Sequence, residues 1–405
     1  MRAAALTLLT AAAAHLCACV SPRPHSLTLV ESSPVEAGLA SPDLPSTATV
    51  WVELLEAAQD RVDLCQFYAS DEPPSQLGPV LAALEAAARR GVRVRLLLSE
   101  AFRKTYPEIG ARVATWPEAD VAWLDLEPIS GGIHHAKYLV VDRRAAYLGS
   151  ANLDWRALEH IVELGVRIDD EGFAGEVAAL FEHDWHLATA PLGLEAPRPA
   201  RREPHTLTLH PEQGAAGPVE ARLVTSPTTL LGREREDELG HLLELIEGAR
   251  ADLRATTLTL RLVDREGRPF QALREALARA AARGVRVRLL VSDWNTRPWL
   301  IGGVQDLARI EGLEVAFLVI PEARSGHIPF ARTLHAKTFV ADDQVAWIGS
   351  SNLEQSYFTR SRNVGVVLSG APAATRLAAW FDDLWSSPFT VVVDPDAEYP
   401  VRRVD

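Results

Sequence analysis

Two short stretches of the sequence carry histidine and lysine side chains at matching intervals. The first spans residues 133–165 and the second spans residues 334–365, and each motif residue of the second copy stands at its counterpart's number plus 200. Because an internal repeat sets the architecture of a chain, it is interpreted before any other feature. The repeated residues are His135, Lys137, Asp142, Gly149, Ser150 and Asn152, matched by His335, Lys337, Asp342, Gly349, Ser350 and Asn352.

These residue types suit a displacement at phosphorus. A phosphodiester gains negative charge on its nonbridging oxygens as the phosphorus becomes five-coordinate, and ammonium, hydroxyl and amide donors stabilise that charge without a metal. One imidazole would attack phosphorus to form a phosphohistidine, while the other protonates the departing oxygen and then activates water or an alcohol. A single His beside a Lys is most often a surface feature, but two such pairs in identical context favour a catalytic site. The predicted donors are Lys137 and Lys337 together with Ser150, Asn152, Ser350 and Asn352.

The elements that must position these residues are two strands. Residues 135–142 and 335–342, HAKYLVVD and HAKTFVAD, are expected to be strands, in which side chains two apart point the same way. The His and Lys of each copy would therefore face a common place. Asp142 and Asp342 fall on the opposite parity at the strand ends, so we expect them to fix the geometry of the catalytic motif and not to touch substrate.

The two strands sit within larger repeated units. Residues 75–90 place apolar side chains on one helical face, Gly91 ends the helix, and residues 92–99 are typical of a largely buried strand. The same unit returns at 270–293 with an offset of 193, so seven further residues must enter the second half before its motif. We expect them within residues 294–332. Alternating helices and strands predict an α/β fold.

The pattern H-x-K-x4-D-x6-G-S-x-N resembles the signature of the phospholipase D superfamily in both halves. The resemblance implies two α/β halves related by a pseudo-twofold axis, with mixed sheets flanked by helices and the active site at their junction. It also implies that His135 is the nucleophile and that His335 is the acid and base. Within the superfamily the chain is most similar to the endolysosomal 5′ exonuclease branch, through residues 149–166, 317–332, 356–359 and 27–34.

Glu163 introduces an asymmetry, because it aligns with Asn363 at the same offset of 200. The resemblance implies that a carboxylate at this position holds a catalytic histidine through its second ring nitrogen, and a negative partner would favour the imidazolium. Whether Glu163 serves the histidine of its own half or of the opposite half is open at this point. The alternative is an exposed Glu at a strand edge.

Four further residues have side chains that bind ligands in other proteins. Tyr357 and Phe358 follow the second motif and are candidates to stack a nucleobase, with core packing as the equal alternative. His183 and His186 lie on an amphipathic helix without a Cys or His cluster nearby, so we expect no metal and no cofactor.

Composition limits the class of protein. Hydrophobic content of 47% and charged content of 23% are typical of a globular protein, and 405 residues allow two or three domains or two halves that share one core. The net charge of −13 argues against broad binding of duplex phosphates, which requires basic patches. A small local anion site is compatible with that charge.

The first residues are expected to direct export. Residues 1–19 are typical of a secretory signal and are too short to span a membrane. Residues 16–19 resemble a bacterial lipobox with Cys19 as the lipidated residue, and lipidation and simple cleavage both remain open. We therefore expect an exported, periplasmic or cell-envelope protein, with a first half at 27–190, a Pro-rich linker at 191–218 and a second half at 219–405.

Three functions compete for this sequence. The first is a metal-independent phosphodiesterase that shortens single-stranded nucleic acid from its 5′ end. The second is phospholipase D or phosphatidyltransferase chemistry on phospholipids, since the same displacement serves both substrates. The third is noncatalytic phosphate binding, which the completeness of both motifs disfavours.

Overall fold

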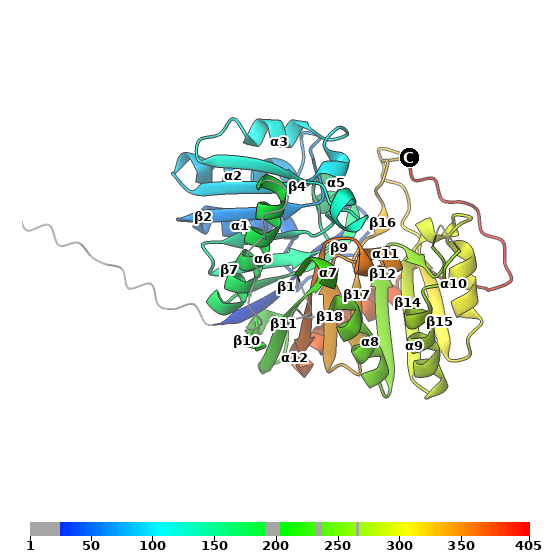
Figure 1. Ribbon diagram of the computed structural model, residues 1–405. Coiled ribbons are helices and arrows are strands. Elements are labelled where there is room, and N and C mark those ends of the chain that lie inside the picture. The colour runs from blue at the N-terminus through cyan, green and yellow to red at the C-terminus, as the bar shows by residue number, and fades with distance from the viewer. Residues whose placement is uncertain (1–24, 191–202, 232–236, 265–266) are drawn as a thin grey trace, which may run out of the picture.

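The computed structural model describes residues 25–190, 203–231, 237–264 and 267–405. The two halves of the chain lie side by side, the first from blue to green and the second from green to red in Figure 1. Among the described residues, no helix is long and apolar enough to cross a membrane. The signal and lipidation expected at residues 1–19, including Cys19, lie outside the described residues.

The first half consists of strands and helices that alternate for most of its length. Its elements are β1 (Ser26–Ser32), α1 (Thr47–Ala57), β2 (Arg61–Gln66), β3 (Ala69–Ser70), α2 (Leu77–Arg89), β4 (Arg93–Ser99), the 3-10 turn η1 (Glu100–Phe102), α3 (Glu108–Val113), β5 (Ala119–Leu124), α4 (Glu127–Ser130), β6 (Tyr138–Val141), β7 (Ala145–Gly149), β8 (Leu153–Asp154), α5 (Trp155–Glu159), β9 (Ile161–Asp169) and α6 (Glu171–Thr189).

The second half repeats this order. It begins with β10 (His205–Leu209) and the turn η2 (Pro211–Gln213), and continues through β11 (Pro218–Ser226), α7 (Thr228–Leu231), α8 (Glu238–Gly248), β12 (Asp252–Thr257), β13 (Leu260–Arg261), α9 (Gln271–Ala282), β14 (Arg286–Ser292), η3 (Asp293–Thr296), α10 (Ile301–Ala308), β15 (Leu313–Leu318), β16 (Thr333–Leu334), β17 (Thr338–Ala341), β18 (Val345–Gly349), β19 (Leu353–Glu354), α11 (Gln355–Thr359), β20 (Asn363–Ser369), α12 (Ala371–Trp385) and β21 (Thr390–Val392).

Each half contains a mixed sheet. In the first, β2, β4 and β5 are parallel, and β2 continues through antiparallel β6, β7, β9 and β1. In the second, the equivalent strands are β12, β14 and β15, followed by β17, β18, β20 and β11. These sheets flanked by helices confirm the predicted α/β class. The repeated element order agrees with the expected duplication.

Burial on both faces explains why each central strand carries an apolar run, LLL in β4 and LLV in β14. In β4 all residues after Arg93 are buried, and β14 shows the same pattern after Arg286. Helices α1 and α2 cover the outer face of the first sheet, and α8 and α9 cover the outer face of the second. The inner faces meet α6 and α12 in one continuous core, so the two halves share that core.

Two segments differ from their predicted structure. Strand β6 begins at Tyr138, so His135 and Lys137 precede the strand instead of lying within it. Part of the expected linker, His205–Leu209, forms β10, which pairs with β1 on one side and β11 on the other. The rest of that segment up to residue 202 lies outside the described residues.

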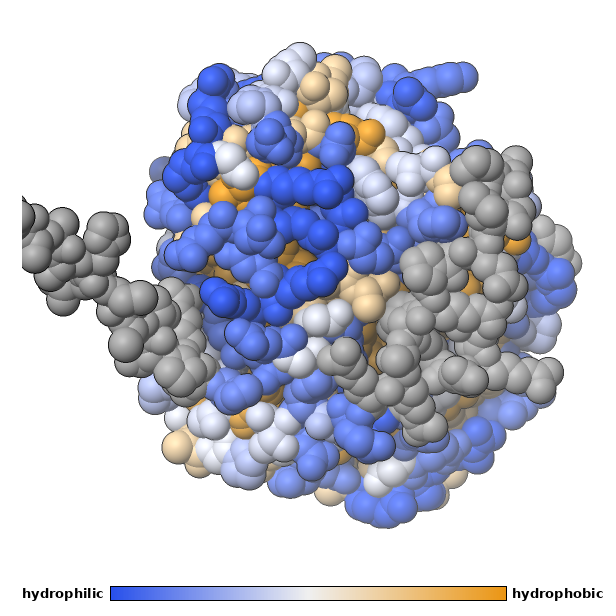
Figure 2. All heavy atoms as spheres, turned by 60° about the vertical axis from the view of Figure 1, so that its left-hand side comes forward, coloured by the Kyte–Doolittle hydropathy of each residue, from blue (hydrophilic) through white to orange (hydrophobic). Residues whose placement is uncertain are grey.

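The extra residues of the second half fall in the predicted segment, 294–332, and most of them lie in one loop. The starts of β5 and β15 are 194 positions apart, whereas the starts of β6 and β17 are 200 apart. Six of the seven residues therefore enter between β15 and β17. Hydrophilic residues cover most of the face seen in Figure 2, and hydrophobic residues show only in small areas between them.

A buried ion pair joins the two halves. The Arg362 guanidinium, just before β20, donates to both carboxylate oxygens of Asp184 in α6, at 2.9 and 3.1 Å. Both side chains are fully buried. Burial raises the pKa of Asp184, but the charge of Arg362 and a hydrogen bond from His183 outweigh that effect and lower the pKa to about 2.

We predict that Asp184→Asn lowers the free energy of unfolding by about 3–5 kcal/mol, because it leaves the buried Arg362 charge unpaired. A folded-state pKa below the unfolded value of about 4 means that this contribution is complete above pH ~4 and is lost as the pH falls toward 2. Urea unfolding at neutral and acidic pH measures both effects. Asp120→Asn is the control, since the Arg93–Asp120 pair is exposed and is worth less than about 1 kcal/mol. Equal losses in the two variants would contradict the buried-pair account.

Candidate active site

Each repeated motif enters the site by pairing with a strand of the opposite half. Leu334 pairs with Val162 of β9, and His134 forms the equivalent bridge with Arg362. The His335 amide donates to the Val162 carbonyl and the His135 amide donates to the Arg362 carbonyl, both at 2.9 Å. The backbone of both histidines is therefore fixed by the half that does not contain it.

The two imidazoles are held through the same ring nitrogen by different partners. His135 Nδ1 lies 2.9 Å from Asn363 Oδ1. His335 Nδ1 lies 2.8 Å from both carboxylate oxygens of Glu163. Glu163 thus serves the histidine of the opposite half, and it is fully buried, so the exposed alternative is wrong. Both contacts leave Nε2 as the ring nitrogen available for chemistry.

The orientation of the Asn363 amide determines the tautomer of His135. Its Nδ2 donates to the Tyr357 carbonyl at 2.9 Å, and its Oδ1 accepts from Ser350 Oγ at 3.0 Å. Because Oδ1 is an acceptor, His135 Nδ1 must carry the proton. The lone pair of a neutral His135 then lies on Nε2, which is the form that a nucleophile requires.

The two lysines are buried beside the histidines. Lys137 Nζ donates to the His135 carbonyl and Lys337 Nζ donates to the His335 carbonyl, both at 2.5 Å. Burial lowers the pKa of Lys337 to about 7, opposed by the charge of Glu163. Burial and the Lys337 charge lower the pKa of Lys137 well below its usual value. Because the Lys337 charge acts on Lys137, an anion that contacts both groups would relieve their repulsion.

The charges of both lysines lower the pKa of each catalytic histidine. Burial is the largest cause of the lowered pKa of His135, followed by the charges of Lys137 and Lys337. Burial is also the largest cause of the lowered pKa of His335, and the charges of the same two lysines lower it further. The two motifs therefore lie in one electrostatic site. Burial also raises the pKa of Glu163 to about 7, although both lysines oppose the shift.

The motif serines do not face substrate, in contrast to their predicted role. Ser150 Oγ and Ser350 Oγ are fully buried, and each bridges the backbone of β9 or β20 at Leu164 or Val364. A Cβ at Gly149 would lie 2.5 Å from Gly165 Cα, so glycine is needed for this close strand approach. The two serine hydroxyls thus position the strands that carry Glu163 and Asn363, the partners of the histidines.

The motif asparagines remain candidates for ligand binding. Asn152 and Asn352 are buried, and within the described part of the chain their Oδ1 atoms have no hydrogen-bond partner. A buried amide oxygen without a partner is costly, so a bound ligand or water would stabilise it.

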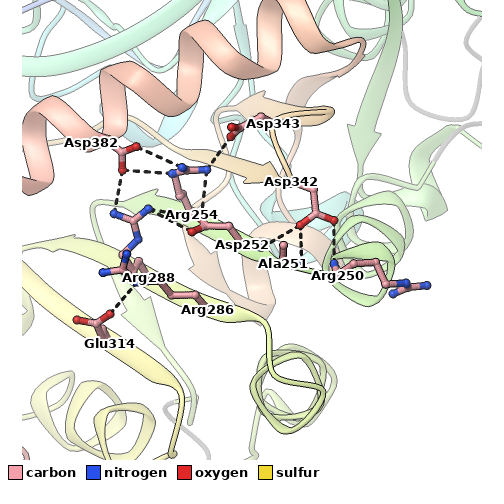
Figure 3. Close-up of polar contacts among 10 residues, drawn as sticks. All are labelled: Arg250, Ala251, Asp252, Arg254, Arg286, Arg288, Glu314, Asp342, Asp343 and Asp382. Carbon is pink, nitrogen blue, oxygen red and sulfur yellow. Dashed lines mark hydrogen bonds and ion pairs between the residues drawn. The ribbon is translucent and has the colours of Figure 1, made fainter.

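Asp142 and Asp342 hold the backbone at the far end of the motif strands. Asp342 accepts the amides of Arg250, Ala251 and Asp252 at 2.8–2.9 Å (Figure 3). Asp142 accepts three amides of residues 59–61 in the same way. Both carboxylates therefore fix the backbone at the end of the motif strand, and neither faces the histidines.

Figure 3 also shows a separate group of arginine ion pairs, which tie β12 and β14 to α12. Arg254 and Arg288 both pair with Asp382 of that helix. The Arg288 guanidinium lies 5.3 Å from the centre of the Phe381 ring. In the first half, Arg95 pairs with Glu182 and lies 4.6 Å from the Phe181 ring centre. The duplication thus extends to the charged network.

Tyr357 and Phe358 have different surroundings. The Tyr357 ring meets the His135 imidazole edge-on, with centroids 4.9 Å apart. Phe358 is buried in the second-half core against Phe270, so its predicted stacking role is wrong. An aromatic ring enclosed by core side chains has no free face for a base.

His183, His134 and Cys65 have structural contacts, whereas the buried Nε2 of His186 has no hydrogen-bond partner among the described residues. His183 contacts Asp184 and the Leu230 carbonyl, and His134 lies 3.1 Å from the buried Cys65 thiol. Over the described ranges, no group of three or more His, Cys, Asp or Glu side chains is placed to hold a metal ion.

One contact of the site was not predicted. Phe67 follows β2, its ring centroid is 4.6 Å from that of His135, and the Lys137 ammonium lies 4.9 Å from its centre. A lone Phe after a strand carries no signal in the sequence. Asn363 did carry one, because it occupies the position equivalent to Glu163.

A cavity of about 460 Å³ lies beside the site, where β4 and β5 end and before Ile133. Its charged lining consists of Glu100, Asp125, Glu127 and Lys104. Three carboxylates against one ammonium group disfavour a phosphate chain in this cavity.

Known proteins are similar to this chain in sequence. Residues 51–185 and 242–385 match the family described as cardiolipin synthase, PLD-like domain. The chain is 30% identical to 5′-3′ exonuclease PLD4 of Mus musculus, over 91% of this chain and 80% of that protein. It is 28% identical to phospholipase D Z of Dictyostelium discoideum, over 91% of each chain.

Among solved structures, the chain is similar to phosphatidylserine synthase of Haemophilus influenzae Rd KW20, with a TM-score of 0.62 and 12% identity over 85% of each chain. It is also similar to polyphosphate kinase from Porphyromonas gingivalis, with a TM-score of 0.56 and 15% identity over 91% of this chain and 48% of that chain. At these identities the structural likeness concerns the fold alone.

We predict that sulfate binds between the two buried lysines and raises the melting temperature at about pH 6 more than at about pH 8.5. Sulfate keeps its charge over this range, whereas Lys337 loses its proton as the pH rises through about 7. Thermal unfolding with sulfate, against chloride at equal ionic strength, measures the difference. Lys337→Met should remove the sulfate effect, and Lys104→Met, an exposed control, should keep it. An identical sulfate response in both variants would contradict this anion site.

Proposed function

The chain belongs to the phospholipase D-like family of phosphodiesterases, and we propose that it shortens single-stranded nucleic acid from the 5′ end through a covalent phosphohistidine, without a metal. The observation that carries the mechanism is the difference between the two histidine partners. An amide holds His135 and a carboxylate holds His335, and these two partners occupy equivalent positions of the repeat.

The first step uses the neutral imidazole as the nucleophile. His135 Nε2 attacks phosphorus, a nitrogen–phosphorus bond forms, and the bond from phosphorus to the leaving oxygen breaks. His335, whose positive form is favoured by the Glu163 carboxylate, gives its Nε2 proton to that oxygen. The ammonium groups of Lys137 and Lys337 stabilise the charge on the nonbridging oxygens.

The bound phosphodiester itself prepares this protonation state. In the empty site, burial and the lysine charges lower the pKa of both histidines. A negative phosphate between the lysines cancels part of their charge, so it raises the pKa of His335 when the proton is needed.

In the second step His335 acts as the base and His135 as the leaving group. Neutral His335 takes a proton from water as the water oxygen attacks the phosphohistidine, and the bond to His135 Nε2 breaks. Glu163 stabilises the imidazolium that forms again. The site then holds a phosphomonoester and the starting protonation states.

The sequence relatives support a nucleic-acid substrate. Relatives at 28–30% identity over more than 90% of this chain are named 5′-3′ exonucleases. Phospholipid hydrolysis or transfer is the second candidate, supported by the phospholipase D name of one relative and by the cardiolipin synthase description of the matching family. The apolar run and Cys19 within residues 1–19 support export to the cell envelope, with or without a lipid anchor.

We predict that the purified chain progressively shortens 5′-hydroxyl oligonucleotides in the presence of a chelator, with release of mononucleotides. His135→Ala and His335→Ala should each lower kcat by at least about 10²–10⁴-fold, because each removes one proton-transfer or nucleophilic group. Time courses on gels with a label at the 3′ end measure the shortening.

Labelled phosphatidylcholine vesicles in the same reaction test the second candidate. Preferential turnover of the vesicles would overturn the nucleic-acid substrate and keep the mechanism. Normal rates in either histidine variant would overturn the mechanism.

A further inference from the structure

Four aromatic side chains extend outward from His135 in the first half. Phe67 contacts both the His135 ring and Phe102, with centroids 4.6 Å apart in each case. Phe102 stacks on Tyr106 with an interplanar angle of 12°, and Tyr106 stacks on Tyr68 at 5.0 Å. All four side chains are only partly buried. Phe67 and Tyr68 follow β2, and Phe102 and Tyr106 lie in and after η1, at the end of β4.

A second aromatic group follows the equivalent strand end of the second half. The Arg297 guanidinium lies 5.4 Å from the centre of the Trp294 ring and 5.6 Å from that of Trp299. Trp294 also meets Phe330 edge-on at 6.4 Å. Trp299 is 60% exposed and Phe330 is 44% exposed. Phe330 lies in the loop between β15 and β17, which contains the six residues that the first half lacks between β5 and β6.

Arg156 joins the two groups. Its guanidinium lies 5.8 Å from the centre of the Tyr106 ring, and its Nη1 donates to the Pro329 carbonyl at 3.5 Å, next to Phe330. The loop itself is fixed to the first half, because the Arg332 amide donates to His160 and its Nη1 donates to the Val35 carbonyl. A continuous series of contacts therefore runs from His135 to Trp299.

We propose that this series is a binding site for the bases of single-stranded nucleic acid that continue beyond the scissile phosphate. We call it the aromatic row: Phe67, Tyr68, Phe102, Tyr106, Trp294, Trp299 and Phe330, with Arg156 and Arg297. The inference rests on the proposed nuclease function and adds the part of the enzyme that holds the rest of the strand. Partly exposed rings stack bases without regard to sequence. The half-buried Arg297 supplies a positive charge beside two of them, whereas Arg156 is buried and paired with Asp154, so it links the two aromatic groups.

The composition of the aromatic row favours a nucleic acid over a membrane. A membrane-binding patch is apolar with cationic side chains at its rim, whereas here Arg297 lies between two indoles and Arg156 lies between the two groups. The row also begins in contact with His135, so a strand bound along it reaches the reacting phosphorus. The neighbouring cavity, with its three carboxylates, offers no comparable path.

The test compares the binding of short and long single strands. Fluorescein-labelled oligothymidylates of two and twelve nucleotides are titrated against His335→Asn, which retains the row and does not complete turnover. We expect the longer strand to bind at least about tenfold more tightly, since stacking on an aromatic side chain contributes about tenfold or more per base. Trp299→Leu, in the same background, should reduce that length preference by about tenfold.

Matched substitutions separate stacking from loss of structure. Trp299→Phe keeps an aromatic face and should retain most of the length preference. Val392→Ser changes an exposed apolar residue of β21, outside the row, and should bind both strands as the parent does. Tyr106→Leu tests the first-half group, and thermal unfolding of each variant checks that it is folded.

An equal affinity for the two strands, or an unchanged length preference in folded Trp299→Leu and Tyr106→Leu, would overturn the row. A loss of binding to phosphatidylglycerol vesicles in Trp299→Leu, without loss of strand binding, would replace it with a membrane-docking surface. If the unsubstituted chain fails to shorten oligonucleotides but strand binding still depends on Trp299, the proposed catalytic function fails and the binding site stands.

Discussion

The structure depends on the crossed pairing of each catalytic motif with the opposite half. The amides of His135 and His335 donate to carbonyls beside β20 and in β9, and their rings are held by Asn363 and Glu163 from those same regions. Neither half can orient its own histidine. The shared core between α6 and α12 and the buried Arg362–Asp184 pair keep these regions in register. The catalytic site is therefore complete only when the two halves are packed together.

In the proposed mechanism, the crossing also gives the two duplicated histidines different chemical roles. Duplicated lysines supply the same positive field to both histidines, so the field alone cannot distinguish nucleophile from acid. The distinction comes from one position, where Glu163 faces one ring and Asn363 faces the other. A phosphate between the lysines completes the arrangement, because its charge offsets the repulsion that the empty site contains. The same phosphate charge suits any phosphodiester, which is why substrate choice must come from surfaces outside the motifs.

The sequence predicted the duplication, the α/β class and the segment that carries the extra residues, because repeated spacing and periodicity are local properties. It could not predict that Glu163 serves the opposite half, since that depends on how two sheets meet. The motif serines were assigned to substrate because their spacing fits a donor, but burial against β9 and β20 uses their hydroxyls for positioning. The predicted stacking role of Phe358 was wrong for a related reason. Adjacent aromatic residues in a short helix point to different environments, and Phe358 points into the core whereas Tyr357 points to His135.

The central claim is that His135 attacks and His335 transfers protons. His335→Asn, given a thymidine phosphodiester of p-nitrophenol, tests it directly, because that leaving group needs no acid for the first step but hydrolysis still needs a base. We predict a burst of about one p-nitrophenolate per chain, accompanied by a thymidine-phosphoryl adduct on the peptide that contains His135. A burst from His135→Asn instead, or continued turnover by His335→Asn without an adduct, would contradict the assignment.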